Sequence, residues 1–260
     1  MTFNTLTYEV TADKVALVTI NRPEAMNAFT MEMCDEFERL WKTIMADDNV
    51  HAVVLTGAPG RAFSTGADVK QNDPLDVDRW YEKDPGDSLG PRSNHMWKPV
   101  ITAVHGLCCG GGFYFLNESD IIICSDDAQF FDPHVTYGLV CAAEPIGLSY
   151  RLPLQEVLRM ALMGNDERLS AETALRIGLV SEITTPEALR DRAYQLAVNI
   201  AKKPPAAIQG TVRAIWESLD LPRSAALNLG LKHCKMGNEK AAKQLDVDAM
   251  RKQMKVFDVR

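Results

Sequence analysis

Two glycine-bearing segments carry the residues with the clearest chemical potential in this sequence. They are residues 62–68 (AFSTGAD) and 105–114 (HGLCCGGGFY), and each follows an apolar run rich in β-branched residues. Glycine lacks a Cβ atom, so its backbone can approach a ligand closely, and the first amides of a helix have no acceptor within that helix. If the two segments face each other, their N–H groups form an oxyanion hole, in which each donor contributes about 3–4 kcal/mol.

Three further side chains are candidates for proton transfer. His134 has a reference pKa of about 6.5, which suits it to exchange protons near neutrality, or it only fixes its loop by hydrogen bonding. Glu144 lies among apolar residues, where burial would raise its pKa and suit a general base, or it only favours the start of a helix. Tyr114 is either a core aromatic residue or a hydroxyl that donates to a developing enolate.

The elements that must position these residues alternate between strand and helix patterns. Short apolar runs bounded by glycine or proline are typical of buried parallel strands, and we expect each glycine segment to begin where one of the long strands ends. Thr30 is a plausible N-cap for a helix. The predicted strands are residues 7–10 and 15–20, which form a hairpin, and 51–56, 99–104, 120–124 and 129–131; the predicted helices are residues 30–46, 151–163 and 188–202.

The pattern changes at residues 202–205 (KKPP). Strands and helices alternate before this point, whereas residues 206–256 are almost entirely helical in pattern. The sequence therefore predicts a core domain of residues 1–203 and a C-terminal helical region of residues 204–260. The polar, proline-containing stretch at residues 71–95 is expected to be irregular, with one short helix near residues 76–83.

The two glycine segments, in this order and at this spacing, resemble the enoyl-CoA hydratase/isomerase (crotonase) superfamily. Residues 21–28 (NRPEAMNA) and 169–180 (LSAETALRIGLV) are similar to two further stretches of that family, so that the resemblance runs along residues 8–215. It implies an α/β fold with a ClpP-like β-β-α spiral core and a C-terminal helical region for trimerisation. It also implies that the backbone N–H groups of Ala67 and Gly111 hold a thioester carbonyl oxygen.

The resemblance further implies an acyl-CoA substrate, no permanently bound cofactor, no metal, and a homotrimer or a dimer of trimers. The histidines and cysteines show no metal-ligand spacing. Aromatic residues near the expected pocket suggest a bulky or cyclic acyl group; they are Trp80, Tyr81, Trp97, Phe113, Tyr114 and Phe115. By this resemblance coenzyme A contacts Arg22, Ala25, Ala67, Asp68, Val69, Lys255 and Phe257.

The acid/base positions depart from the family pattern. Hydratases of the family carry two glutamates, and matching residue by residue puts Tyr114 and His134 in their places. Addition of water needs one group to activate the water and another to deliver a proton. We therefore expect a hydratase or isomerase in which His134, Glu144 and Tyr114 are the catalytic candidates. The alternatives are a CoA-thioester hydrolase, a C–C hydrolase or a decarboxylase of the same fold, and a catalytically silent CoA-binding subunit.

Composition excludes some classes of function and favours a cytoplasmic enzyme. The net charge of −7 disfavours nucleic acid as a partner. No apolar run approaches the roughly 20 residues that span a bilayer, and the N-terminus lacks the pattern of a signal peptide. Six cysteines without paired spacing are expected to be reduced thiols, most of them buried.

Overall fold

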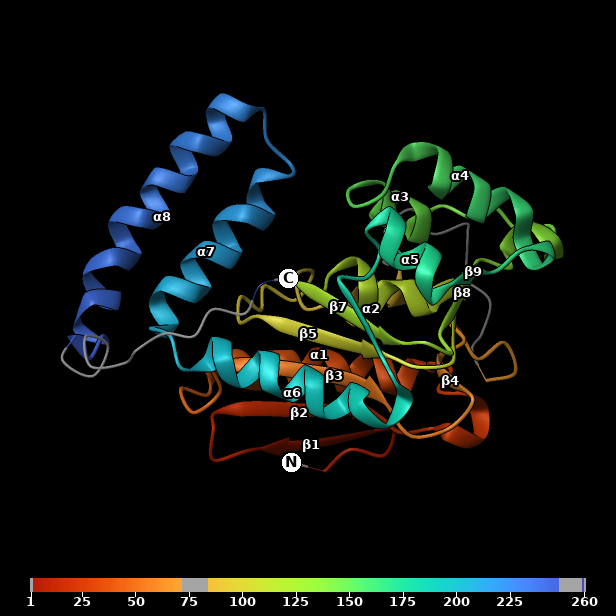
Figure 1. The fold of residues 1–260 in the computed structure, drawn as a ribbon, viewed down its shortest axis with the longest axis horizontal. Helices are drawn as coiled ribbons and strands as arrows, with labels where there is room; N and C mark the ends of the chain where they lie inside the picture. The colour runs from red at the N-terminus through yellow and green to blue at the C-terminus, as the bar shows by residue number, and fades with distance from the viewer. Residues whose placement is uncertain (1, 72–83, 248–258, 260) are drawn as a thin grey trace. The chain divides into compact units, whose positions relative to one another are not determined.

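The computed structural model describes residues 2–71, 84–247 and 259 (Figure 1). The chain forms two compact units, residues 1–201 and 202–260. The sequence had predicted the boundary two residues later, between residues 203 and 204. The short helix expected near residues 76–83 lies outside the described residues, as do Trp80, Tyr81, Lys255 and Phe257.

A six-stranded sheet forms the centre of the first unit, with the strand order β1-β2-β3-β5-β7-β10. The first two strands are an antiparallel hairpin, and every later pairing is parallel. The predicted strands of this sheet are confirmed to within a residue or two at each end. Their bounds are β1 Leu6–Val10, β2 Val15–Ile20, β3 Ala52–Gly57, β5 Val100–Val104 and β7 Ile121–Ser125. The sixth strand, β10 (Glu182–Thr184), was not predicted.

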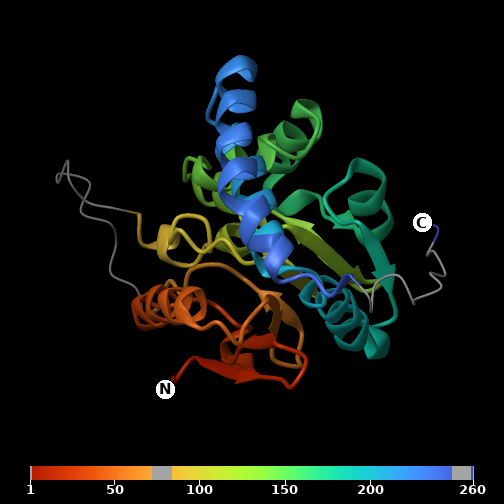
Figure 2. The ribbon, with the colours of Figure 1, turned by 90° about the vertical axis from the view of Figure 1, so that its left-hand side faces the viewer.

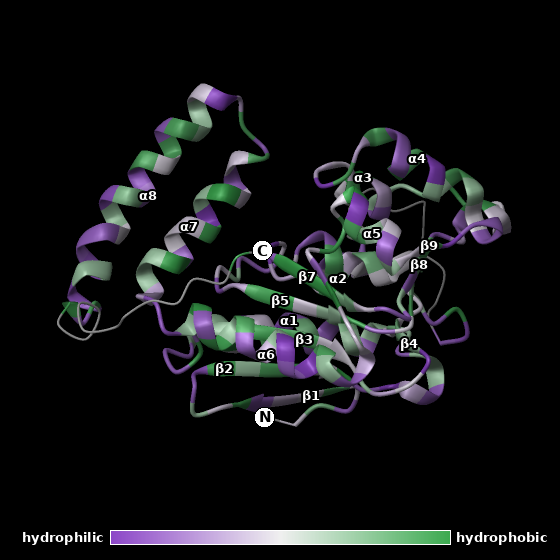
Figure 3. Ribbon diagram, viewed as in Figure 1, coloured by the Kyte–Doolittle hydropathy of each residue, from purple (hydrophilic) through white to green (hydrophobic). Residues whose placement is uncertain are grey.

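One long helix covers each face of this sheet, namely α1 (Met31–Ala46) and α6 (Pro186–Ala201). Figure 2 shows α1 in orange and α6 in cyan on either side of the strands. Side chains alternate between the two faces of a strand, so Leu55 packs in one core cluster with Phe37 of α1, and Val54 in the other with Ala193 of α6. Because both faces are buried, the central strands are apolar along their length (Figure 3).

A second, four-stranded sheet has the order β4-β6-β8-β9. The segment of residues 105–114 begins directly after β5, as expected, whereas residues 62–68 begin several residues after the end of β3. Two strands of this second sheet, β4 and β6, lie within the glycine segments. After β5 the chain turns at Gly106, whose φ is 56° and where a Cβ atom would lie 2.3 Å from the Arg61 carbonyl oxygen, and then enters β6. The bounds are β4 Ala62–Ser64, β6 Leu107–Cys109, β8 Gln129–Phe131 and β9 Leu169–Ser170.

Short helices connect the two sheets and carry most of the candidate side chains. The 3-10 helices are η1 Pro23–Ala25, η2 Pro85–Ser88, η3 Gly110–Gly112, η4 His134–Tyr137 and η5 Gly164–Asp166, and the α-helices are α2 Phe113–Asn117, α3 Ala143–Ser149, α4 Leu154–Met163 and α5 Ala171–Ile177. Thr30 is confirmed as the N-cap of α1, since its hydroxyl accepts a hydrogen bond from the Met33 amide. All six cysteines are free thiols, and four of them are buried.

The described part of the second unit, residues 202–247 and 259, contains two helices, α7 (Pro205–Ser218) and α8 (Arg223–Lys243), which pack against each other. This agrees with the helical pattern predicted after residue 205. In the described part of the chain, no helix combines the length and the apolar character needed to cross a membrane.

Candidate active site

The two glycine segments meet beside the second sheet. Gly66 has a φ of 81°, and a Cβ atom there would lie 2.7 Å from the amide nitrogen of Gly111. A Cβ atom on Gly111 would lie 2.5 Å from the ring of Phe29, which itself pairs with Ala67 through an isolated β-bridge. Glycine is therefore required at both positions for the segments to approach this closely. Ala67 and Gly111 both line the same cavity.

That cavity has a volume of about 1510 Å³. It lies between η1, the segment after β4, α2, η4 and the start of α3, so residues far apart in the sequence share it. The structure brings together nearly all of the site residues predicted from the sequence and described here. Those that line the cavity are Arg22, Ala25, Ala67, Asp68, Val69, Gly111, Tyr114, His134 and Glu144.

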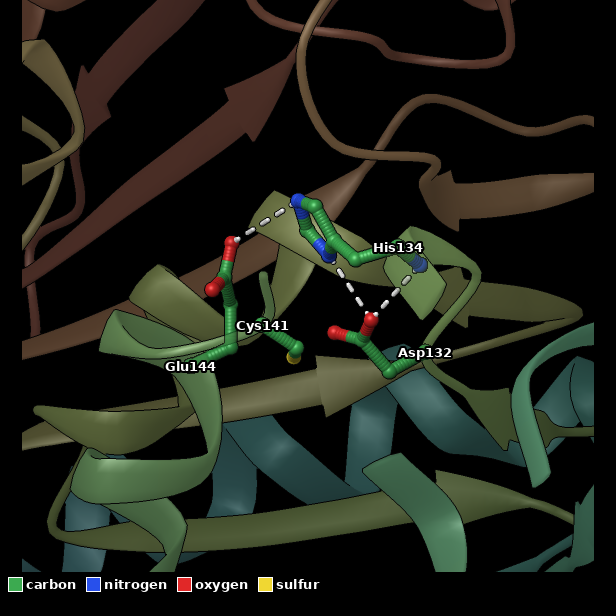
Figure 4. A group of neighbouring side chains, drawn as sticks. All are labelled: Asp132, His134, Cys141 and Glu144. Atoms are coloured by element: carbon green, nitrogen blue, oxygen red, sulfur yellow. Dashed lines mark hydrogen bonds and ion pairs between the residues drawn. The ribbon is translucent and has the colours of Figure 1, made fainter. Parts of the chain in front are cut away.

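His134 is the first residue of η4 and is held by Asp132 (Figure 4). Its Nδ1 atom lies 2.7 Å from Oδ1 of Asp132, which also accepts a hydrogen bond of 3.0 Å from the His134 amide. This bond to a buried carboxylate raises the pKa of His134 above its usual value, although partial burial of the ring opposes the shift. The sequence reasoning missed Asp132. The available signal was an aspartate two residues before the histidine, a spacing at which its side chain accepts a backbone N–H.

Glu144 approaches the other ring nitrogen of His134. Its Oε1 atom lies 3.8 Å from Nε2, and the glutamate side chain is 8% exposed (Figure 4). Burial raises the pKa of Glu144, and the carboxylates of Asp132 and Asp84 act in the same direction, against the effect of His134. Glu144 also lies in the first turn of α3, so both sequence interpretations of this residue describe part of its environment.

Tyr114 projects from α2 into the same cavity, but its aromatic neighbours do not. Its hydroxyl donates a 2.5 Å hydrogen bond to Oδ2 of Asp84, a residue that the sequence reasoning also missed. Burial, followed by this bond, raises the pKa of Tyr114. Phe113 and Phe115 are fully buried in the core, and Trp97 is not among the cavity residues, so the expectation that these three aromatic residues line an acyl pocket was wrong.

Arg22 and Asp68, which also line the cavity, form an ion pair. Nη2 of Arg22 lies 3.0 Å from Oδ2 of Asp68, and each side chain is 11% exposed. Nη1 of Arg22 donates to the Ala28 carbonyl oxygen at 2.6 Å. Arg22 lines the cavity, where a cation with a planar array of donors suits a phosphate group. Asp68 thus orients Arg22.

Four side chains near the candidate acid/base pair are of types that bind metal ions. Their ligand atoms lie within 4.8 Å of one another, and the residues are Asp132, His134, Cys141 and Glu144 (Figure 4). Carboxylate, imidazole and thiolate groups are zinc ligands. The hydrogen bond between Asp132 and His134 accounts for the proximity of that pair without an ion. The expectation that the site uses no metal stays a prediction.

Comparison with known proteins gives a consistent set of relatives. The family model for enoyl-CoA hydratase/isomerase matches residues 11–253. The chain is 36% identical to an (E)-benzylidenesuccinyl-CoA hydratase from Thauera aromatica, over 84% of each chain, and 33% identical to a short-chain-enoyl-CoA hydratase from Clostridium acetobutylicum, over 82% of each. The crystal structure of an enoyl-CoA hydratase/isomerase from Mycobacterium paratuberculosis superposes with a TM-score of 0.84 at 38% identity, covering 95% of this chain and 94% of that one.

Proposed function

The chain belongs to the enoyl-CoA hydratase/isomerase family, has the crotonase fold and is an enzyme that acts on acyl-CoA; we propose that it adds water across the α,β-double bond of an enoyl-CoA thioester, with Glu144 and His134 as its acid/base pair. One observation carries this proposal. His134 presents one ring nitrogen to Glu144 at 3.8 Å, while the other is bound to the buried Asp132 at 2.7 Å. A site without the usual glutamates therefore still has two proton-transferring groups.

In this proposal the thioester carbonyl oxygen accepts hydrogen bonds from the amides of Ala67 and Gly111. Attack at the β-carbon moves electrons toward that oxygen and forms an enolate, whose negative charge the two donors stabilise more strongly than the neutral carbonyl. The close contact between Gly66 and Gly111 supports this role, because it fixes the spacing between the two amides before substrate arrives.

Glu144 is the base in this scheme. Its carboxylate removes one proton from a water molecule while the water oxygen bonds to the β-carbon of the acyl group. A carboxylate whose pKa is raised by burial is a stronger base than an exposed one, and it is still ionised near neutral pH if the shift is moderate.

His134 is the acid. In its protonated form, which the bond to Asp132 favours, it delivers the Nε2 proton to the α-carbon as the enolate collapses. The product gains a hydroxyl group on the β-carbon and a hydrogen on the α-carbon, which accounts for both parts of the water. A proton then returns from Glu144 to His134, and the contact of 3.8 Å between them supports that transfer.

The experiment is incubation of the purified protein with crotonyl-CoA and with cyclic and aryl enoyl-CoA thioesters in H₂¹⁸O and, separately, in D₂O. Mass spectrometry is expected to show ¹⁸O in an acyl group that is still attached to CoA. Glu144→Gln and His134→Gln should each lower kcat by about 10²- to 10⁴-fold. Glu24→Gln is the matched control, because Glu24 lines the same cavity and lies outside the acid/base pair. Deuterium uptake without ¹⁸O would instead identify an isomerase.

Hydrolysis is the second candidate function. A histidine oriented by a buried carboxylate is also the arrangement that activates water for attack on a carbonyl carbon. In the same experiment, release of free CoA, or cleavage of a carbon–carbon bond with ¹⁸O in a new carboxylate, would favour this candidate over hydration.

Three further features belong to the same proposal. Arg22, Ala25 and the backbone from Ala67 to Val69 contact coenzyme A, which enters as part of the substrate; Lys255 and Phe257, outside the described residues, cover it. In the same proposal, residues 204–260 form the oligomerisation region of a cytoplasmic homotrimer or dimer of trimers. The mass of the native protein in solution, measured by light scattering, tests the oligomeric state.

A further inference from the structure

We propose that Asp84 is a positioning residue, which holds the Tyr114 hydroxyl so that its oxygen accepts a hydrogen bond from the attacking water. This inference rests on the proposed hydration and assigns a function to a carboxylate that lies 30 residues before Tyr114 in the sequence. It also gives Tyr114 a role opposite to that of a donor to the enolate.

Both carboxylate oxygens of Asp84 have partners. Oδ1 accepts a hydrogen bond of 2.9 Å from the Gly86 amide, as the N-cap of η2, and Oδ2 accepts the bond from Tyr114. A Cβ atom on Gly86 would lie 2.4 Å from the Tyr114 ring, so the backbone of η2 packs directly on that ring. The pair is thus fixed by a cap, a short hydrogen bond and a close backbone contact.

The chemistry of a phenol determines what this bond does. A tyrosine hydroxyl has one proton to donate and lone pairs that accept. The Tyr114 proton is committed to Asp84, while Tyr114 and Asp84 both border the cavity. The oxygen therefore offers an acceptor, not a donor, to a molecule bound there. It cannot donate to an enolate without breaking the bond to Asp84.

Helix α2 fixes this acceptor relative to the rest of the site. The helix begins two residues after Gly111, and Tyr114 is its second residue. One turn later, Nδ2 of Asn117 donates a 3.0 Å hydrogen bond to the carbonyl oxygen of Glu144. A Cβ atom on Gly147 would lie 2.2 Å from the side-chain nitrogen Nδ2 of Asn117, so α3 packs tightly against the same residue. The short helix α2 thus fixes the positions of the Tyr114 side chain and of the Glu144 backbone relative to the proposed oxyanion amides.

A water molecule between these groups meets two acceptors. Glu144 takes one water proton, and the Tyr114 oxygen holds the other, which leaves a lone pair of the water oxygen free for the β-carbon. Holding a nucleophile in one orientation lowers the entropic part of the barrier. The charged and titratable groups around Glu144 are Asp84, Tyr114, Asp132, His134 and Cys141, and among them Asp84 helps to raise the pKa of Glu144.

The test is a double-mutant cycle with Asp84→Asn and Tyr114→Phe, measured as kcat and KM on an enoyl-CoA that the wild type hydrates. Asparagine is as good an N-cap as aspartate, so η2 should be retained. Its single carbonyl oxygen cannot accept hydrogen bonds from both the Gly86 amide and the Tyr114 hydroxyl as the two carboxylate oxygens do. Its NH₂ group can instead donate to the phenol oxygen, which reverses the direction of that hydrogen bond. We expect each single variant to lose about tenfold in kcat with little change in KM.

The double variant separates positioning from a structural role. If Asp84 acts through Tyr114, Asp84→Asn should cost nothing further in kcat when Tyr114 is already phenylalanine. In both backgrounds it should move the acidic limb of the pH–kcat profile to lower pH, because a carboxylate near Glu144 is lost. Asp87→Asn is the control, since it removes a carboxylate from the same 3-10 helix but not from the cavity lining.

Two results would overturn the inference. One is a wild-type kcat for Asp84→Asn, and the other is additive losses in the double variant, which would show that the two residues act independently. Failure of the proposed function looks different, because the wild type itself would then incorporate no ¹⁸O into a CoA-bound product. Circular dichroism melting curves for each variant identify any loss that is due to unfolding.

Discussion

The two halves of the site are built in different ways. The proposed oxyanion half consists of backbone amides at Ala67 and Gly111, and the close approach of the two segments requires glycine at positions 66 and 111. The proposed acid/base half consists of side chains, His134 and Glu144, which are held by hydrogen bonds with Asp132 and Asn117. The first half agrees with the family pattern, whereas the second departs from it.

This difference shows which part of an enzyme can change its residues. The two glycines that let the backbone donors approach each other cannot be replaced by a larger residue, because a Cβ atom on Gly66 or Gly111 would lie within 2.7 Å of another group. A proton-transferring side chain, in contrast, can come from any element that reaches the cavity. Here a histidine on η4 and a glutamate on α3 line the same cavity as Ala67 and Gly111.

Among the variants that test this comparison, Gly66→Ala changes the backbone half and should have the largest effect. Its φ of 81° is strained for alanine, and the new Cβ atom would lie 2.7 Å from the Gly111 amide nitrogen. We expect kcat to fall by about 10²- to 10³-fold, the cost of losing one oxyanion donor. Gly60→Ala is the control, because its Cβ atom would meet only ordinary contacts at 3.7 Å. Equal kcat values for the two folded variants would contradict a fixed oxyanion hole.

The pH dependence of kcat tests the side-chain half as a pair. Glu144 must be ionised, so activity falls as pH drops through its pKa, which is raised above the usual 4.5. His134 must be protonated, so activity also falls as pH rises through its pKa, raised above the usual 6.5. We expect a bell-shaped profile with the acidic limb above pH 4.5, the alkaline limb above pH 6.5, and about a tenfold loss per pH unit outside the window. A flat alkaline side would exclude protonated His134 as the acid.

Asp132→Asn should produce a smaller and more specific loss. Without the carboxylate the imidazolium is less stable, so the pKa of His134 falls and the alkaline limb moves to lower pH. A shift of one pH unit corresponds to about a tenfold loss of kcat on that limb. The acidic limb serves as the internal reference in the same titration. If the whole profile drops without a shift, Asp132 contributes to folding and not to the charge of His134.

The smallest expected effect comes from Asn117→Ala, which removes a contact that positions Glu144 in the acid/base half. It removes the hydrogen bond to the Glu144 carbonyl oxygen, at a cost of about 1 kcal/mol in the free energy of unfolding. Less exact placement of Glu144 should lower kcat a few-fold. Urea denaturation of the same sample measures the loss in the free energy of unfolding. Asn199→Ala on α6 is a matched exchange away from the cavity. If both variants lose kcat equally, Asn117 has no specific role.

Sequence patterns predicted the fold well where the signal is local. Apolar runs located the long strands, and Thr30 marked the start of α1, because burial on both faces and capping depend on residues near in sequence. The short strands β4 and β6 were not separated from the glycine segments that follow them. The strand β8 (Gln129–Phe131) is equally short and was predicted, so length alone does not explain the difference. β4 and β6 lie within two segments that were interpreted from their glycines.

The site divides in the same way. The sequence by itself located the two glycine segments that meet at the cavity, because a glycine requirement is visible in the residue type. Only the tertiary structure paired His134 with Glu144, joined Tyr114 to Asp84, and moved Phe113 and Phe115 into the core. Hydrogen bonds and burial between segments depend on how the chain packs. Residue type alone does not show which way a side chain points.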